Sequence, residues 1–204
     1  DGLTLIDAGL SGDAKRILKY IAGLGAEIRH KPGDVRRILI THADGDHVGG
    51  LAALKQATGA RVYAHAAEAK AIEAGIASRP LKVSGLLKWV MGLTAPLFKA
   101  APVHVDEFVT DGQILPVLGG LRVVETIGHT PGHVSYFAPS AHILFVGDSM
   151  VADKSGLHGS RGMNTWDQEK ANGAVRKQAA LGAQVVCSGH GPVVRDATFP
   201  QVEA

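Results

Sequence analysis

Short apolar runs alternate with helical hydrophobic patterns over the first part of the chain. Apolar runs at residues 3–7, 36–40 and 61–64 predict strands. Apolar residues at helical spacing, such as Ile17, Ile21 and Leu24, and an alanine-rich stretch predict helices over about 13–24, 51–57 and 66–74. Strand followed by helix, repeated three times, predicts an α/β layered fold.

The second half of the chain is richer in strands. The pattern predicts strands at 121–127, 134–138, 142–146 and 184–187, and a helix over about 166–181. Residues 78–102 interrupt the rhythm, because they are apolar but broken by prolines, and they are too irregular to span a membrane. This apolar insertion is interpreted as a flap over a site, a dimer surface or core packing. We expect a single domain over 1–204.

The composition fits a globular enzyme better than a nucleic-acid-binding protein. The 204 residues are 46% hydrophobic and 20% charged, with a net charge of +2 and no dense basic run. The single Cys187 excludes an internal disulfide and a multi-thiolate zinc site, and its apolar surroundings predict an inert thiol. No export signal is visible, so we expect a cytoplasmic protein. The abrupt start at Asp1 leaves a preceding segment with a targeting signal as an open alternative.

Ligand-type side chains follow four of the predicted strands. In chain order these are His42, Asp44, Asp46 and His47, then His129, then Asp148, and finally His190. A glycine stands directly before each of the last three, where it allows a sharp turn of the backbone. Imidazole and carboxylate groups together suit Zn²⁺ and other first-row divalent ions. A polar turn with incidental histidines would explain one such loop, but four in order predict a metal site.

This series of motifs resembles the metallo-β-lactamase-fold hydrolase superfamily. Its members carry His-x-His-x-Asp-His, then a histidine in a Gly-His loop, a lone aspartate and a histidine before Gly-Pro. The corresponding segments here begin at His42, His129, Asp148 and His190. The resemblance implies a four-layer αββα sandwich with a two-metal site at one edge. Because the sheet order of the family begins upstream of Asp1, the N-terminal strands are expected to be absent from this sequence.

The resemblance also implies a role for each ligand. His42 and His129 would bind the first metal, Asp46, His47 and His190 the second, and Asp148 would bridge the two. Asp44 stands where the family usually has its second histidine. It either binds the first metal through oxygen, which we favour, or is too short to reach it. Zinc is the expected metal, and the harder carboxylate ligand widens the choice to iron or manganese.

The predicted activity is hydrolysis of a small ester, lactone, thioester or β-lactam. A metal-bound hydroxide would attack the carbonyl, and Asp46 would orient it and move the proton. Two alternatives remain: a di-iron redox protein, because Asp44 resembles the carboxylate ligand of such members, and a non-catalytic metal-binding module.

Other polar residues are expected to support the ligands. Asp7 either orients a ligand histidine or caps a turn, Thr41 either bonds a ligand or finishes its strand, and His133 has a supporting role. We expect a small-molecule substrate, no nucleic-acid or membrane partner, and a homodimer as an open option.

Overall fold

The computed structural model describes residues 2–79 and 100–200. The chain divides into two compact units, the first formed by Asp1–Ser78 with Val83–Phe108 and the second by Arg79–Lys82 with Val109–Ala204. Most of the apolar insertion at 78–102 lies outside the described residues. Its three interpretations, and the expectation of a single domain, therefore stay predictions.

The first unit is built on a four-stranded sheet in the order β1-β2-β3-β4. Its strands are β1 (Leu3–Ile6), β2 (Val35–Leu39), β3 (Arg61–His65) and β4 (Glu107–Val109). Because β1, β2 and β3 run parallel, helices must carry the chain back between them. These helices are α1 (Ala14–Gly23), α2 (Gly25–Ile28), α3 (Gly45–Val48) and α4 (Leu51–Thr58), with α5 (Ala66–Ala74) after β3.

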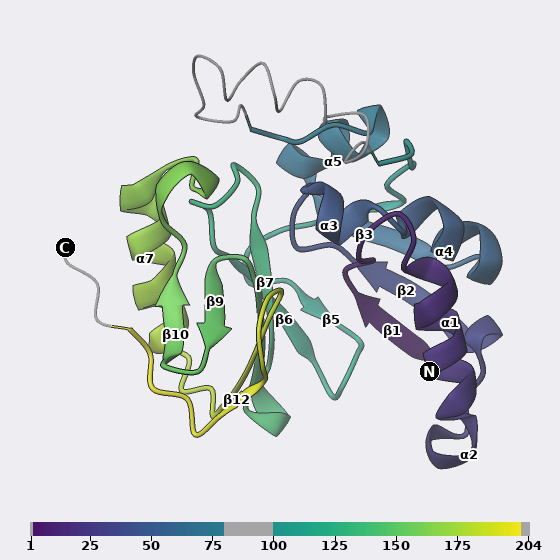
Figure 1. Cartoon of the computed structure of the whole chain (residues 1–204). Helices are drawn as coiled ribbons and strands as arrows, with labels where there is room; N and C mark the ends of the chain where they lie inside the picture. Colours follow the sequence, from purple (N-terminus) through teal and green to yellow (C-terminus); the bar gives the residue numbers. More distant parts are fainter. Residues whose placement is uncertain (1, 80–99, 201–204) are drawn as a thin grey trace. The chain divides into compact units, whose positions relative to one another are not determined.

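The centre of this unit is the apolar run that ends β2. Ile38, Leu39 and Ile40 are completely buried, as expected for a parallel strand with neighbours on both sides. Helices α1 and α4 contact each other beside the sheet (Figure 1), and Leu51 and Leu54 of α4 join the same core. The buried strand is a rigid support for the loop that follows it.

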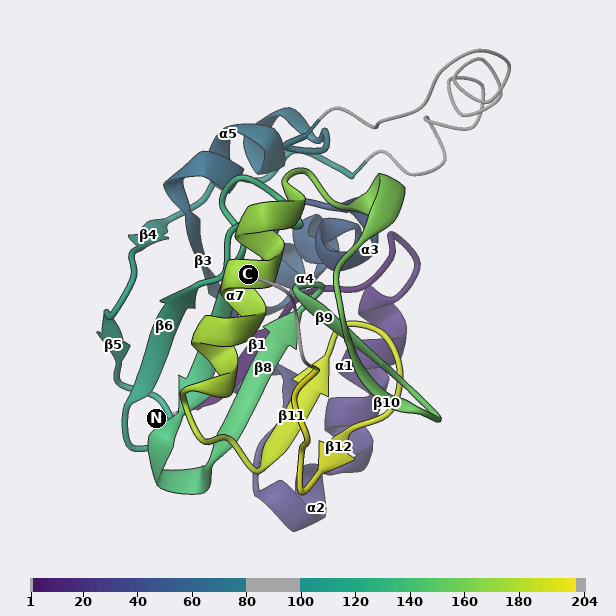
Figure 2. The same cartoon turned by 90° about the vertical axis from the view of Figure 1, so that its left-hand side faces the viewer.

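The second unit is built on a six-stranded sheet in the order β12-β11-β8-β7-β6-β5. Its strands are β5 (Ile114–Leu115), β6 (Leu121–Glu125), β7 (Val134–Ala138), β8 (Ile143–Gly147), β11 (Val185–Ser188) and β12 (Val194–Arg195). Strands β9 (Met150–Asp153) and β10 (Gly156–Gly159) form a separate hairpin. Helix α7 (Gln168–Ala179) crosses one face of the sheet (Figure 2) and links the parallel pair β8 and β11.

The predicted strands and the longer helices are confirmed, with ends shifted by a few residues. The sequence pattern missed β4, β5, β9, β10 and β12, and it missed the short helices α2 and α3. Strands β5 and β12 have two residues each. Alternation cannot be recognised over so short a length, and pairing with a longer neighbour defines these strands instead.

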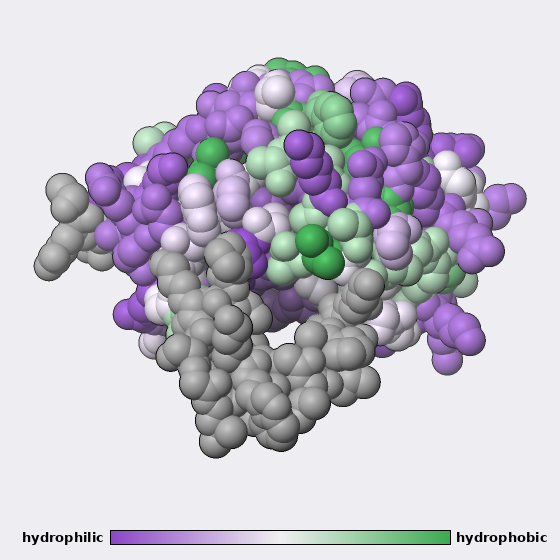
Figure 3. All heavy atoms as spheres, turned by 90° about the horizontal axis from the view of Figure 1, so that it is seen from above, coloured by the Kyte–Doolittle hydropathy of each residue, from purple (hydrophilic) through white to green (hydrophobic). Residues whose placement is uncertain are grey.

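The surface of the described residues carries scattered hydrophobic side chains. Tyr20, Phe108 and Ile114 are exposed and belong to different elements. On the face shown in Figure 3, hydrophobic atoms form small groups among hydrophilic ones. Among the helices of residues 2–79 and 100–200, none has the length and apolar character needed to cross a membrane.

A partly buried ion pair joins α4, β3 and the segment before β4. Asp106 Oδ2 accepts hydrogen bonds from Lys55 Nζ and the Val62 backbone N–H, both at 2.7 Å. Burial alone would raise the pKa of Asp106, but these two donors hold the pKa below its ordinary value. The stabilisation is therefore present above the ordinary carboxyl pKa and is lost as the pH falls through the lowered one.

We expect Asp106→Asn to lower the free energy of unfolding by about 1 kcal/mol at neutral pH, because the charged partner of Lys55 is lost. The loss should shrink at acidic pH, where the wild-type carboxylate becomes protonated. Urea denaturation at several pH values measures both effects, with the exposed Glu27→Gln in the same unit as the control. A loss that is constant with pH would contradict the assignment.

Candidate metal centre

The candidate ligands lie where the sequence predicted them, just after four strands. His42 follows β2, His129 follows β6, Asp148 directly follows β8 and His190 follows β11. Asp44, Asp46 and His47 complete the loop after β2. Each ligand loop therefore starts from a strand, whose sheet hydrogen bonds fix the point at which the loop begins.

In the first unit, the ligand loop is residues 41–48, which we call the histidine loop. The Nε2 atom of His42 lies 3.6 Å from Asp44 Oδ2, and that of His47 lies 3.9 Å from Asp46 Oδ2. The two imidazole rings are adjacent, with centroids 4.1 Å apart. Short helix α3 begins after Asp44 and accounts for this compactness, because the backbone N–H groups of His47 and Val48 both bond the Asp44 carbonyl.

Asp7 anchors the histidine loop from the end of β1. Its carboxylate accepts hydrogen bonds from the Thr41 backbone N–H and hydroxyl, both at 2.8 Å, and lies 2.8 Å from His47 Nδ1. Thr41 Oγ1 also lies 2.9 Å from His42 Nδ1. Of the two roles considered for Asp7, the structure supports orientation of a ligand histidine, and Thr41 contacts a ligand as well as ending its strand.

Glu68 of α5 fixes the middle of the same loop. Its buried carboxylate accepts a hydrogen bond of 2.8 Å from the backbone N–H of Ala43, the residue between His42 and Asp44. The sequence analysis missed this residue, because a glutamate in an alanine-rich helix resembles an ordinary solvent-facing residue. Its burial is visible only in the structure.

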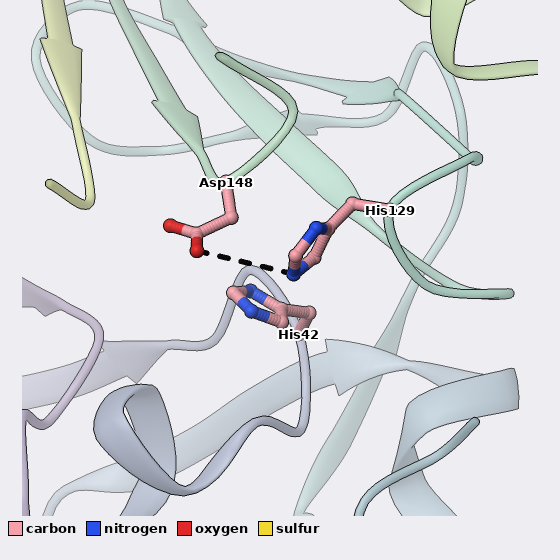
Figure 4. A group of neighbouring side chains, drawn as sticks. All are labelled: His42, His129 and Asp148. Carbon is pink, nitrogen blue, oxygen red and sulfur yellow. Dashed lines mark ion pairs between the residues drawn. The ribbon is translucent and has the colours of Figure 1, made fainter. Parts of the chain in front are cut away.

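In the second unit, Asp148 lies between two imidazoles. Its Oδ2 atom is 3.3 Å from His190 Nε2 and 3.9 Å from His129 Nε2. Figure 4 shows the side chains of His129 and Asp148 directed toward each other. His129 and Asp148 are largely buried, whereas the side chain of His190 is 52% exposed. One carboxylate oxygen thus faces the same ring atom of two histidines.

Unusual glycine conformations precede two of these ligands. Gly128 has φ +149°, and a side chain there would collide with the Ala171 backbone, only 2.3 Å away. Gly147 has φ +50°, in the left-handed region that favours glycine. Gly189 does not have a positive φ. The sharp backbone turn predicted at each of the three glycines is therefore present before His129 and Asp148 but not before His190.

His133 supports Asp148, in agreement with the predicted supporting role. Its Nε2 accepts a hydrogen bond of 3.1 Å from the Asp148 backbone N–H, and its Nδ1 lies 2.8 Å from the Thr126 hydroxyl. Because Nε2 acts as an acceptor, the proton of the neutral ring is on Nδ1. His133 is fully buried and fixes the backbone at Asp148.

Two further residues near His129 were not found from the sequence. Ser160 Oγ lies 3.0 Å from His129 Nδ1, and the buried Arg79 Nη2 lies 3.4 Å from His129 Nε2. Neither residue belongs to a recognisable motif, and each is far from His129 in the sequence. No local signal could have identified them.

Cys187 takes no part in this chemistry. Burial raises the pKa of its thiol, so the group stays protonated at neutral pH. The expectation of an inert thiol agrees with this.

Comparison with known families identifies the chain. Residues 1–190 match the family model described as "Metallo-beta-lactamase superfamily". The chain belongs to the metallo-beta-lactamase superfamily. Among curated proteins, it is 29% identical to "Probable metallo-hydrolase YflN" of Bacillus subtilis over 92% of this chain and 74% of that protein. It is 32% identical to a "Hydroxyacylglutathione hydrolase" of Cereibacter sphaeroides over 80% of this chain but only 51% of that protein.

Solved structures of the superfamily share the fold. A metallo-beta-lactamase of Cronobacter sakazakii with a HARLDQ motif superposes with a TM-score of 0.69 at 26% identity, covering 92% of this chain and 70% of that chain. A metallo-beta-lactamase family protein of Thermus thermophilus also gives a TM-score of 0.69, at 25% identity over 94% of this chain and 65% of that chain. The predicted α/β metallo-beta-lactamase fold, with two main sheets and flanking helices, is confirmed.

The donor set fits the metal site of this superfamily. Each unit gathers imidazole and carboxylate donors: His42, Asp44, Asp46 and His47 in the first, and His129, Asp148 and His190 in the second. Three of the histidines share one orientation: their Nδ1 points toward an oxygen and their Nε2 toward a carboxylate. These are His42, His47 and His129. This orientation is typical of a histidine that binds a metal through Nε2. The chain is accordingly a metal-dependent hydrolase of this superfamily. The part played by each residue, including Asp44 and the catalytic Asp46, stays a prediction.

Proposed function

We propose that this protein is a binuclear hydrolase that cleaves a small ester, lactone, thioester or β-lactam. The observation that carries the proposal is the position of Asp148 Oδ2, which faces His129 Nε2 and His190 Nε2. A carboxylate oxygen between two imidazoles is suited to bridge two cations, each of which also needs a nitrogen ligand.

We assign the first metal to His42, Asp44 and His129, and the second to Asp46, His47 and His190, with Asp148 shared by both. Zinc is the proposed metal, because imidazole and carboxylate ligands suit it. Asp44 supplies a second oxygen to the first metal and makes iron or manganese an alternative. The 3.6 Å separation of Asp44 Oδ2 and His42 Nε2 supports this assignment, because ligands of one ion must lie close together.

When bound, two metal ions would supply an activated water and polarise the substrate carbonyl. The protein residues then have separate tasks. Asp46 is the most exposed carboxylate of the histidine loop, with 39% of its side chain accessible, so it is placed to accept and return a proton. Asp7 and Thr41 hold the histidine loop, and His133 holds the backbone of Asp148.

A thioester or lactone is our preferred substrate class. The loop Gly-His-Thr-Pro-Gly-His at residues 128–133 supports this choice through its similarity to glyoxalase II-like thioesterases and lactonases. The hydroxyacylglutathione hydrolases among its relatives support it as well, although this chain spans about half of their length. Three expectations stay predictions. They are the cytoplasmic location, a small-molecule substrate with no nucleic-acid or membrane partner, and a homodimer.

A hydrolysis panel tests the proposal. Metal-free protein is loaded with zinc, manganese or iron and assayed with a p-nitrophenyl ester, an acyl lactone, an S-acyl thioester and nitrocefin. We expect two metal ions per chain and metal-dependent cleavage of the lactone or thioester. Asp46→Ala should remain folded and lose turnover by about 1000-fold, equivalent to about 4 kcal/mol of transition-state stabilisation.

Two results would change the assignment. Oxygen consumption by the iron-loaded protein without cleavage of any panel substrate would favour the redox alternative. Stoichiometric metal binding with neither activity would favour a metal-binding module. Undiminished turnover in Asp46→Ala would refute the proton-transfer role of Asp46.

A further inference from the structure

A series of buried hydrogen bonds connects helix α7 to the backbone of Asp148. His133 Nδ1 lies 2.8 Å from Thr126 Oγ1, and Thr126 Oγ1 lies 2.9 Å from Ser135 Oγ. Ser135 Oγ lies in turn 3.3 Å from Oε1 of Gln178, a residue of α7. All four side chains are completely buried, so water does not compete for these bonds. We call His133, Thr126, Ser135 and Gln178 the donor chain.

Each end of the donor chain bonds a backbone group. At one end, the Asp148 backbone N–H donates to His133 Nε2 at 3.1 Å. At the other end, Gln178 Nε2 donates to the Ala174 carbonyl at 3.1 Å, so the amide oxygen Oε1 faces Ser135. A backbone N–H can only donate and a carbonyl can only accept, so neither end can be reversed.

These fixed ends give every bond of the donor chain one direction. Because His133 Nε2 accepts, its Nδ1 carries the proton and donates to Thr126 Oγ1. The Thr126 hydroxyl then donates to Ser135 Oγ, and the Ser135 hydroxyl donates to Gln178 Oε1. Starting from the Gln178 oxygen, which must accept, gives the same directions. Hydrogen bonds that all point one way polarise and strengthen one another.

One other acceptor lies near Ser135. The Val146 carbonyl is 3.4 Å from Ser135 Oγ, but it also accepts from the Ser149 hydroxyl at 2.7 Å and from the Ser149 N–H at 3.2 Å. A carbonyl oxygen has two lone pairs, and the shorter bonds of Ser149 occupy them. The Ser135 proton therefore belongs to Gln178, whose Oε1 also lies 3.1 Å from Ser149 Oγ. Gln178 thus contacts the residue after Asp148 directly and reaches the Asp148 N–H through the donor chain.

Stability alone does not account for so many polar groups in this core. Each group of the donor chain loses its bonds to water on folding, so each internal bond contributes only about 1 kcal/mol net, and apolar side chains of the same shape can be equally stable. The donor chain adds a defined position instead. With its proton on Nδ1, His133 accepts from the Asp148 N–H, whereas the other tautomer would direct a second N–H at it. The backbone position of Asp148 therefore depends on the tautomer of His133.

Resting on the proposed metal site, we infer that the donor chain positions Asp148 and that Gln178 anchors it on α7. Thr126, Ser135 and Gln178 are therefore positioning residues. They keep the proton of His133 on Nδ1, and the imidazole in turn holds the backbone that carries the Asp148 carboxylate. Helix α7 thereby takes part in the site, although none of its residues is among the candidate ligands.

Nuclear magnetic resonance of the metal-free protein tests the tautomer directly. The ¹⁵N resonances of wild-type His133 should show the proton on Nδ1. Thr126→Val keeps the shape of the side chain but removes the hydroxyl, so His133 should lose its single tautomer and the Asp148 amide hydrogen should exchange faster with solvent. Thr126→Ser keeps the hydroxyl and should restore both signals. Thr58→Val is the matched control, because it removes a partly buried threonine hydroxyl that bonds the Leu54 carbonyl in the other unit.

Zinc affinity tests the consequence for the site. Zinc is titrated into each metal-free variant in competition with a chromophoric chelator. Thr126→Val should weaken zinc binding by about 10-fold, the lower end of the effect of removing an outer partner of a metal ligand. Gln178→Leu removes the far end of the donor chain and should cause the same changes to a smaller extent, because the Ser135 hydroxyl can still turn to the Val146 carbonyl. This variant also keeps the inference testable if Thr126→Val does not fold.

The outcomes separate the inference from the function on which it rests. A wild-type tautomer, amide exchange rate and zinc affinity in both Thr126→Val and Gln178→Leu would overturn the inference. A lower free energy of unfolding with these three readouts unchanged would also overturn it, since the donor chain would then only stabilise the fold. Wild-type protein that binds no zinc would refute the proposed function, whereas the tautomer and the amide exchange rate would still decide the inference.

Discussion

Replacing Asp148 with alanine should remove metal binding and lower turnover by about 1000-fold or more, since metal assistance contributes several kcal/mol to the transition state. Asp148 Oδ2 faces both His129 and His190 in the second unit. Its loss would leave these two imidazoles without their shared oxygen. Metal content after dialysis and the rate of thioester or lactone hydrolysis measure the two effects.

The metal-free Asp148→Ala protein should remain folded. The backbone N–H that bonds His133 Nε2 is retained in the variant, so the loop keeps its main anchor. Asp111→Ala is the matched control, because Asp111 is an aspartate of the same unit whose carboxylate pairs with Lys177. Asp148→Ala that still holds two ions would contradict a bridging role.

Replacing Asp7 should have the largest effect on stability. Asp7→Ala removes the acceptor for the Thr41 backbone N–H, the Thr41 hydroxyl and His47 Nδ1, and Thr41 and His47 are buried. Each buried donor left without an acceptor costs about 1–3 kcal/mol. We expect a total loss of about 3–5 kcal/mol in the free energy of unfolding, smaller than the sum because the loop can relax. Chemical denaturation of the metal-free protein measures it.

Two companion variants separate the causes. Asp7 has φ +61°, a left-handed conformation that costs an alanine about 1 kcal/mol. Asp7→Gly removes the carboxylate without this strain and should be about 1 kcal/mol more stable than Asp7→Ala. Asp7→Asn tolerates the conformation and keeps one oxygen, so its loss should be about half that of alanine. Wild-type stability of Asp7→Gly and Asp7→Asn would show that the carboxylate does not anchor the histidine loop.

Most of the regular structure followed from local pattern. Strand β7 and helix α5 have the predicted bounds, because each has a continuous local signal in the sequence. Helix α3 was missed because its four residues lie within the ligand motif and carry no apolar stripe. The pairs that define β5 and β12 depend on neighbouring strands, and a single sequence does not reveal such neighbours.

The sequence by itself determined which side chains follow the strands, because an apolar run and the polar residue after it are local features. It therefore predicted His42, His129, Asp148 and His190 and the superfamily they indicate. Only the tertiary structure decided what holds them. The partner of His47 lies 40 residues away, at Asp7, and that of His129 lies 31 residues away, at Ser160. Contacts over such separations arise from packing of the whole chain, and no periodicity or spacing records them.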